Sequence, residues 1–139
     1  MNQSDAAYLA GLFDGEGSVY FKKTRQKKHQ RPGKPIHNVM VIRMEIAMTD
    51  KSVLEWVWET TGVGAFGSKK VKEGYKPQWR WRAAHRDALK VCKELWPFAQ
   101  TKLHKIEQII DYYEPDLQGL GENIVNFEHY KTLMKDEKR

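Results

Sequence analysis

Strict alternation of apolar and polar side chains is the feature that most limits how this chain can fold. Over residues 39–47 every second position is large and apolar, whereas the positions between include Arg43 and Glu45. The apolar set is Met40, Ile42, Met44 and Ile46. A period of two is typical of a strand with one buried face and one solvated face. Residues 78–82 repeat the pattern, so the sequence predicts a sheet that is covered on one side only.

Helical and turn signals surround these strands in a regular order. Helices are expected where apolar residues recur every three or four positions between capping residues and glycine or proline, and strands where β-branched and aromatic residues cluster. The predicted helices span residues 6–15 after Ser4 and Asp5, 51–61 after a cap at Thr49 or Asp50, 86–95 before Pro97, 101–113, and about 123–134. The predicted strands span residues 18–22, 39–47, 65–71 and 78–82, with a long loop over 24–37. The repeated helix-strand-strand unit predicts an α+β fold with one antiparallel sheet and helices on one face.

Size and cysteine usage exclude several classes of protein. A chain of 139 residues corresponds to one domain and can bury a core without covalent staples. The single cysteine, Cys92, excludes an internal disulfide and a cysteine-rich zinc cluster. No apolar run approaches the roughly 20 residues that a membrane span needs. We therefore expect a soluble intracellular protein with no membrane partner and no small-molecule cofactor. Residues 1–114 are predicted to form the domain, and residues 115–139 a helical tail continuous with it.

The charge distribution favours a polyanionic partner. Lys and Arg number 24 against 18 Asp and Glu, which gives a net charge of +6. Basic residues gather over positions 22–34 and 69–82, and such runs are often no more than solvated surface. Alternation, however, directs Lys22, Arg43, Lys69 and Arg80 to the same side of the predicted sheet. A ribbon of that kind fits the DNA major groove, where arginine and lysine read guanine.

The end of the first predicted helix carries an unusual combination of residues. Ala7, Gly11 and Gly15 recur every four positions and form a stripe of small side chains, which suits close packing either on the chain's own sheet or on another helix. Asp14 and Glu16 bracket Gly15 where the last helical carbonyls have no intrahelical partner. A carboxylate is unfavourable at this negative helix end, unless a divalent cation such as Mg²⁺ binds there.

Residues 9–17 resemble the signature of the LAGLIDADG homing endonucleases. They read Leu9-Ala10-Gly11-Leu12-Phe13-Asp14-Gly15-Glu16-Gly17 and depart from the signature by Phe13 for Ile, Gly15 for Ala and Glu16 for Asp. Three further segments resemble the same family in order: residues 48–64, residues 78–82, and Leu95-Trp96-Pro97-Phe98 followed by Lys102. The resemblance covers roughly residues 6–114. It implies an αββαββα fold whose four-stranded antiparallel sheet is saddle-shaped.

The resemblance also implies roles for individual residues. Glu16 and the backbone carbonyl of Gly15 would bind the catalytic metal, Mg²⁺, for which Mn²⁺ can substitute, and Lys102 would act near the scissile phosphate. Lys51 is a weaker candidate for a second basic group, and Met48 stands where many relatives carry a polar residue. Because each chain has one motif and a duplex has two strands, the resemblance implies a homodimer. The residues implied at its interface are Ala7, Gly11, Asp14 and Gly15.

The substrate that the resemblance implies is a long, near-palindromic double-stranded DNA site, cut on both strands. The predicted contacts from the sheet face are Tyr20, Lys22, Thr24, Arg43, Glu45, Lys69, Arg80 and Arg82. Contacts from the adjoining loop are predicted for Arg25, Lys27 and Lys28. The alternative reading is an RNA maturase or regulator of the same fold that binds nucleic acid without cutting DNA. A structural DNA-binding dimer is a third reading, and it predicts no metal dependence.

Overall fold

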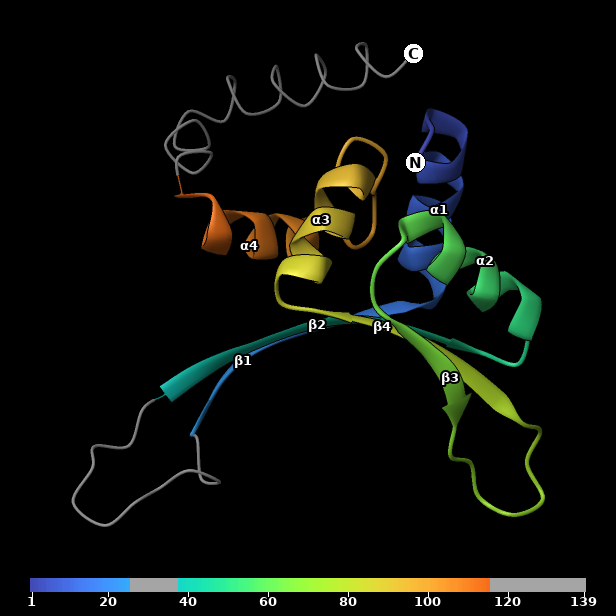
Figure 1. The fold of residues 1–139 in the computed structure, drawn as a ribbon. Helices are drawn as coiled ribbons and strands as arrows, with labels where there is room; N and C mark the ends of the chain where they lie inside the picture. Colours follow the sequence, from blue (N-terminus) through green and yellow to red (C-terminus); the bar gives the residue numbers. More distant parts are fainter. Residues whose placement is uncertain (26–37, 116–139) are drawn as a thin grey trace.

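A computed structural model describes residues 1–25 and 38–115 of the chain. The element order is helix, two strands, helix, two strands and two helices (Figure 1). The elements are α1 (Gln3–Glu16), β1 (Gly17–Arg25), β2 (Asn38–Met48), α2 (Lys51–Thr61), β3 (Ala65–Lys69), β4 (Gln78–Ala84), α3 (Arg86–Leu95) and α4 (Leu103–Tyr113). The predicted α+β class and element order are confirmed. The helix predicted over residues 123–134 lies outside the described residues.

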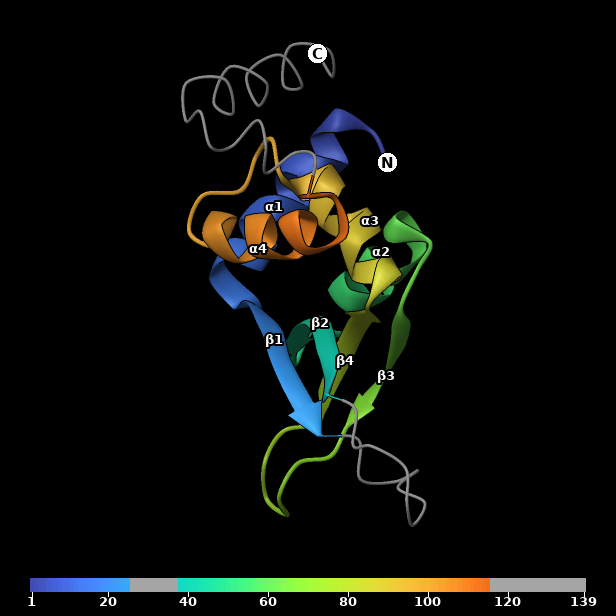
Figure 2. The same cartoon turned by 90° about the vertical axis from the view of Figure 1, so that its left-hand side faces the viewer.

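The four strands form one antiparallel sheet in the order β1-β2-β4-β3. The sheet is arched, and its two hairpin ends bend away from the helices (Figure 1). All four helices lie on the convex side, as the view turned by 90° also shows (Figure 2). The concave face has no helix of the described chain on it. The saddle-shaped sheet that the resemblance implied is therefore present.

Some predicted boundaries were wrong because tertiary pairing sets the lengths of the strands. β1 continues past residue 22 to Arg25, where it pairs with Asn38 of β2. β4 continues past residue 82 to Ala84, which pairs with Arg43 of β2. β3 ends at Lys69 instead of residue 71, because its pairing with β4 ends at Gln78. In each case the register with the neighbouring strand decides where the strand stops.

The helix starts differ for a local reason, which is the choice of capping group. α1 begins at Gln3, because the side chain of Asn2 accepts a hydrogen bond of 2.8 Å from the N–H of Asp5. It continues through Gly15 to Glu16. α2 begins after Asp50 and ends at Gly62, whose φ of 68° suits a glycine cap, as predicted. α4 begins at Leu103 instead of residue 101, and a carboxylate from another helix accounts for its start, as described below.

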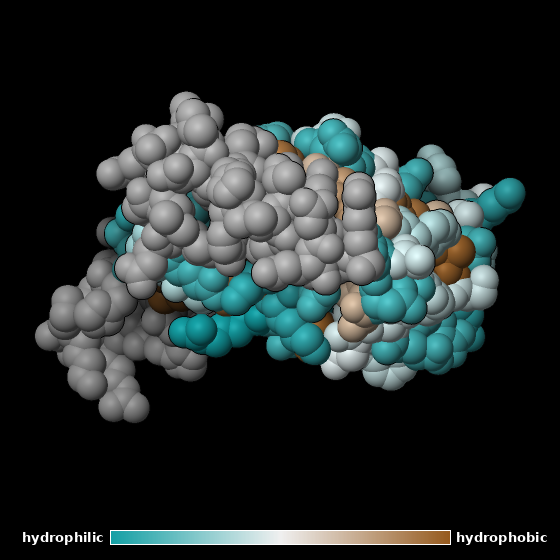
Figure 3. Space-filling view, turned by 90° about the horizontal axis from the view of Figure 1, so that it is seen from above, coloured by the Kyte–Doolittle hydropathy of each residue, from teal (hydrophilic) through white to brown (hydrophobic). Residues whose placement is uncertain are grey.

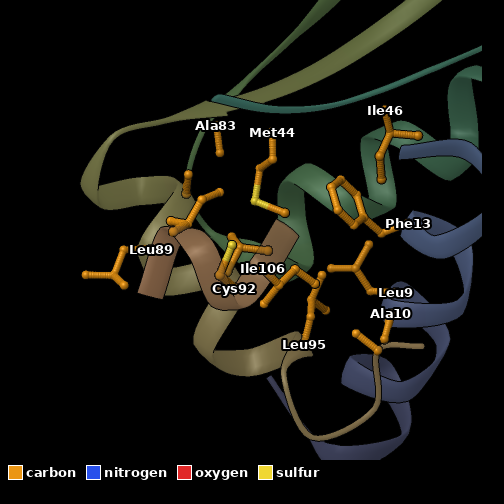
Figure 4. Close-up of a cluster of buried hydrophobic side chains, with 14 of the residues drawn as sticks. Leu9, Ala10, Phe13, Met44, Ile46, Ala83, Leu89, Cys92, Leu95 and Ile106 are labelled. Atoms are coloured by element: carbon orange, nitrogen blue, oxygen red, sulfur yellow. The ribbon is translucent and has the colours of Figure 1, made fainter. Parts of the chain in front are cut away.

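The core lies between the convex sheet face and the helices. The predicted apolar face of β2 supplies Ile42, Met44 and Ile46, which are fully buried. Leu9 and Phe13 of α1 point into the same layer, with Phe13 directed toward Ile46 (Figure 4). Each large side chain buried in this way contributes about 1.5–3 kcal/mol to folding. Among the described residues, no helix is long and apolar enough to cross a membrane.

Candidate nucleic-acid interface and cleavage site

The register of the sheet places all of the predicted sheet contacts on its concave face. Tyr20 pairs with Arg43, and Glu45 pairs with Arg82. Side chains of directly paired residues lie on the same face, and so do those two positions along a strand. The shared face carries Tyr20, Lys22, Thr24, Arg43, Glu45, Lys69, Arg80 and Arg82. The strand parity read from the sequence was therefore right in all four strands.

Glu45 holds two of the arginines on this face. Its Oε1 lies 3.1 Å from Nη2 of Arg82 and 3.4 Å from Nε of Arg80. Nε of Arg82 is buried and has no hydrogen-bond partner within the described chain. These side chains are half-buried, so the ion pairs orient the guanidinium groups more than they stabilise the fold. The three residues form a fixed group with one net positive charge.

Tyr20 organises the remaining cations on the β1–β2 arm. The guanidinium of Arg43 lies 4.5 Å from the centre of the Tyr20 ring, and the ammonium of Lys22 lies 5.5 Å from it. Both distances fall within the range of cation–π attraction. The ring therefore orders two long side chains that would otherwise move freely. The side chain of Arg25, and the whole of Lys27 and Lys28, lie outside the described residues.

The β3–β4 arm carries an open hollow on the same face. It has a volume of about 300 Å³ and is lined by Ala65, Phe66, Gly67, Ser68, Arg80 and Arg82. The small residues Ala65 and Gly67 pair with Arg82 and Arg80, so the low part of the surface lies beside the two guanidinium groups. Sequence patterning did not single out this hollow. Its only trace in the sequence is the pair of small residues at alternate positions of β3.

Two hydrogen bonds bring Lys102 to the end of α1 that carries Glu16. The carboxylate of Asp14 accepts one from the N–H of Gln100 and one from the N–H of Lys102, both at 2.9 Å. Glu16 is exposed two residues further along α1, and Lys102 is half-buried. α1 reaches the middle of the arch at this end (Figure 1). The tertiary structure thus links the backbone of Lys102 to Asp14, two residues before Glu16 and far away in sequence. It also shows both oxygens of Asp14, predicted at a helix interface, engaged within the chain.

The stripe of small residues on α1 faces away from the sheet. Ala7, Gly11 and Gly15 are exposed, whereas Leu9 and Phe13 face the core. A Cβ atom built on Gly11 or Gly15 would meet no atom of the described chain within 4 Å. Packing on the chain's own sheet therefore does not explain these residues. The view from above shows a mostly hydrophilic helix side with separate apolar patches where it is not covered (Figure 3).

Aromatic residues beside this stripe were not anticipated from the sequence. Tyr8 is 56% exposed and meets Trp56 of α2 edge to face, with ring centres 5.1 Å apart. Together with Ser52 and Val53 they line a shallow groove of about 290 Å³. The ammonium of Lys51, the weaker candidate for a second basic group, lies 4.6 Å from the centre of the Trp79 ring. The sequence signal that could have indicated the groove was Tyr8, an aromatic residue next to the stripe of small residues.

The donor set at the end of α1 is sparse for a metal site. Residues 1–25 and 38–115 contain no group of three or more His, Cys, Asp or Glu side chains that could hold a metal ion. Burial raises the pKa of the Cys92 thiol to about 12, and hydrogen bonds from Ser52 and Val53 lower the pKa of Asp50. A metal at Glu16 would therefore need ligands beyond the His, Cys, Asp and Glu side chains of these residues.

Comparison with known proteins rests on solved structures, because no protein-family model and no curated protein matches the chain. The archaeal intron-encoded homing endonuclease I-Vdi141I, solved with DNA, matches 98% of this chain and 84% of its own, with a TM-score of 0.61 and 15% identity. The group I intron-encoded homing endonuclease I-CeuI, also solved with DNA, matches 99% and 67%, with a TM-score of 0.60 and 14% identity.

A third match is the homing endonuclease I-CvuI, solved with a DNA target in the presence of 2 mM Mg. It covers 82% of this chain and 73% of its own, with a TM-score of 0.56 and 16% identity. The matches agree in architecture at low sequence identity, so they establish the fold.

Proposed function

We propose that this chain, which has the fold of the LAGLIDADG homing endonucleases, is a metal-dependent site-specific DNA endonuclease. The observation that carries the proposal is the pair of hydrogen bonds from Gln100 and Lys102 to Asp14, which brings Lys102 to the end of α1 that carries Glu16. A carboxylate and an ammonium near the middle of a concave cationic sheet suit chemistry on a phosphodiester held against that sheet.

The concave face supports binding of double-stranded DNA. An antiparallel ribbon is narrow enough to enter the major groove, and arginine donates two hydrogen bonds to guanine there. Glu45 fixes Arg80 and Arg82, and Tyr20 orders Arg43 and Lys22. Ordered donors lose less conformational entropy on binding than free ones. The homing endonucleases I-Vdi141I and I-CeuI, of the same fold, were both solved with DNA.

The oxygen donors at the end of α1 are of the kind that Mg²⁺ prefers, but they are too few to fill its coordination shell. The Glu16 carboxylate is exposed, and Gly15 belongs to the last turn, whose carbonyls lack intrahelical partners. Both are hard oxygen donors, which Mg²⁺ prefers, and Mg²⁺ also keeps waters and phosphate oxygens in its shell. One such chain therefore provides part of a site that DNA and water would complete. When bound, the ion would neutralise phosphate charge and activate a water molecule.

The remaining chemistry is assigned to the chain's own residues. Negative charge accumulates on the phosphate oxygens as the nucleophile attacks, and a fixed cation lowers the energy of that state. We assign this role to the ammonium of Lys102. We assign to Glu16 the binding of the ion and its placement against the phosphate. Lys51, whose ammonium lies against Trp79, has no part in this proposal.

A homodimer follows from the proposed activity, because both strands of the duplex have to be cut. A duplex backbone has two-fold symmetry, and two copies of one chain can match it through the same surface on each copy. The exposed stripe of Ala7, Gly11 and Gly15 allows two α1 helices to approach closely. The meganuclease I-SmaMI, which matches 99% of this chain over 43% of its own, is long enough to hold two such units. The target would then be long and nearly palindromic.

Cleavage of a randomised duplex library tests the proposal. With Mg²⁺ we expect the wild-type protein to cut a limited set of related duplexes, and Glu16→Gln to bind the same set with cleavage at least 100-fold slower. Glu55→Gln, which changes an exposed glutamate on α2, is the matched control and should cleave like wild type. Binding by the wild type without cleavage would favour the maturase or regulator reading. Cleavage that persists in a chelator would exclude the metal-dependent mechanism.

A further inference from the structure

We infer that Asp14 is a positioning residue, which fixes Lys102 relative to Glu16 by accepting hydrogen bonds from the backbone that leads into α4. The inference rests on the proposed function. Lys102 is the N-cap of α4 and precedes its first residue, Leu103; its carbonyl accepts hydrogen bonds of 3.0 Å from the N–H groups of Lys105 and Ile106. The side chain of Lys102 makes no capping hydrogen bond. Asp14 of α1 instead accepts from the N–H of Lys102 and of Gln100.

This arrangement explains how a lysine can occupy the N-cap position. Helix N-caps are usually Ser, Thr, Asp or Asn, whose side chains accept from the first N–H groups. A positive side chain is also unfavourable there, because the N-terminus of a helix is its positive end. The carboxylate of Asp14 accepts from the N–H of Lys102 itself and of Gln100, and it supplies the compensating negative charge. The side chain of Lys102 has no acceptor with which to cap the helix, and it is left for another role.

The contact also defines the distance between the two halves of the candidate site. Asp14 precedes Glu16 by two residues in the same helix, so the N–H of Lys102 is tied directly to the helix end that carries Glu16. The connection between α3 and α4 is anchored a second time through Trp96 and Ala99, which are buried. A shift of about 1 Å at a reacting centre can reduce a rate roughly 100-fold. Loss of the hydrogen bonds to Asp14 should therefore reduce the cleavage rate more than it reduces the affinity for DNA.

Asp14→Asn is the most informative substitution, because it keeps the shape of the side chain. The amide has only one acceptor oxygen, so one of the two backbone N–H groups would face an NH₂ donor instead. With enzyme in excess over a duplex that the wild type cleaves, we expect the single-turnover cleavage rate of Asp14→Asn to be 10- to 100-fold lower than that of the wild type. The dissociation constant for DNA should stay within twofold. Asp14→Glu, which keeps a charged acceptor, should recover part of the rate.

Asn2→Ala is the matched control. It removes a side-chain cap from the opposite end of α1, where Asn2 accepts from the N–H of Asp5. Each substitution removes a side-chain acceptor for a backbone N–H near a helix end. Asn2→Ala should therefore lower the melting temperature in a similar way but leave the single-turnover rate within twofold of wild type. If Asp14→Asn does not fold, Asp14→Glu is compared with Asn2→Ala in the same assay.

The remaining outcomes separate the rival roles of Asp14. Equal cleavage rates in Asp14→Asn and wild type, or equal losses in Asp14→Asn and Asn2→Ala, would overturn the inference. A raised Mg²⁺ requirement in Asp14→Asn would make Asp14 a metal ligand instead, and a defect cured by high protein concentration would make it a dimer contact. If the wild-type protein cuts no duplex, the proposed function itself fails, and the positioning role fails with it.

Discussion

Single carboxylates organise both parts of the candidate site. Asp14 joins the start of α4 to the end of α1, and Glu45 holds Arg80 and Arg82 on the concave face. Neither carboxylate has to react with a substrate in order to matter. Each fixes long cationic side chains, or the backbone that carries them, and so reduces the entropy that DNA binding and cleavage would otherwise cost.

Cys92 gives a prediction at the residue scale, because its thiol is fully buried in the core. Burial raises the pKa of this thiol from 9.0 to about 12. In the unfolded chain the thiol ionises near pH 9, whereas the folded protein keeps it neutral. The stability contributed by the raised pKa of the Cys92 thiol is thus complete below pH 9 and is lost as the pH rises toward 12. Relative to Cys92→Ala, the free energy of unfolding should fall by about 1.4 kcal/mol between about pH 8 and pH 10.

Denaturant titrations at the two pH values measure this difference. The native thiol should also resist alkylation by iodoacetamide and react only after unfolding. Rapid alkylation of the native protein, or an equal pH dependence in Cys92→Ala, would show that the thiol is not buried in solution.

The junction between α1 and β1 is the element-scale feature on which the site depends. Gly17 caps α1 through its N–H, which donates to the carbonyl of Phe13, and it opens β1 opposite Ile46. A Cβ atom at this position would overlap the ring of Phe13, which is fully buried. The helix can therefore turn directly into the strand only because residue 17 has no side chain.

Gly17→Ala should destabilise the fold by about 1–3 kcal/mol, since the core is already close-packed at Phe13. Urea unfolding measures the loss. Gly67→Ala is the matched control in a strand, because a Cβ there meets no described atom within 4 Å. Adding Phe13→Leu to Gly17→Ala should recover part of the stability, because the smaller side chain makes room. Additive effects of the two changes would contradict the proposed overlap.

At the scale of the whole molecule, the arch separates two surfaces for which we propose different partners. The concave face collects the ordered cations, and the outer side of α1 exposes the stripe of small residues. Within the described chain nothing covers that stripe at Gly11 or Gly15. The proposed dimer would align two arches end to end and bring two Glu16 side chains together near the symmetry axis.

Gly11→Leu tests this assembly without disturbing the fold of one chain. The added side chain has open space in the single chain, so thermal stability measured at low protein concentration should not fall. Two helices could no longer approach closely, and we expect sedimentation to report a monomer instead of a dimer. Gln108→Leu, at an exposed position of α4, is the control and should stay dimeric. A dimer that persists in Gly11→Leu would exclude the stripe as the interface.

Local patterns were enough to predict the elements and the face on which each strand residue lies. Alternation in β2 and β4 specified which side chains are buried, because a shift of one residue would move every apolar side chain to solvent. The cap at Asp50 and the left-handed Gly62 specified α2 in the same local way. The stripe on α1 was also visible, although its direction, toward the sheet or away from it, was left open.

Only tertiary structure could join Lys102 to Asp14, beside Glu16, and group Glu45 with Arg80 and Arg82. These contacts link positions 35 to 88 residues apart, and no local periodicity carries information over that distance. The start of α4 shows the reason. The N–H of Lys102, the residue just before the helix, could have found an acceptor nearby, but its acceptor is Asp14 at the end of α1. Backbone groups take whichever acceptor the packed fold presents, and packing is a property of the whole chain.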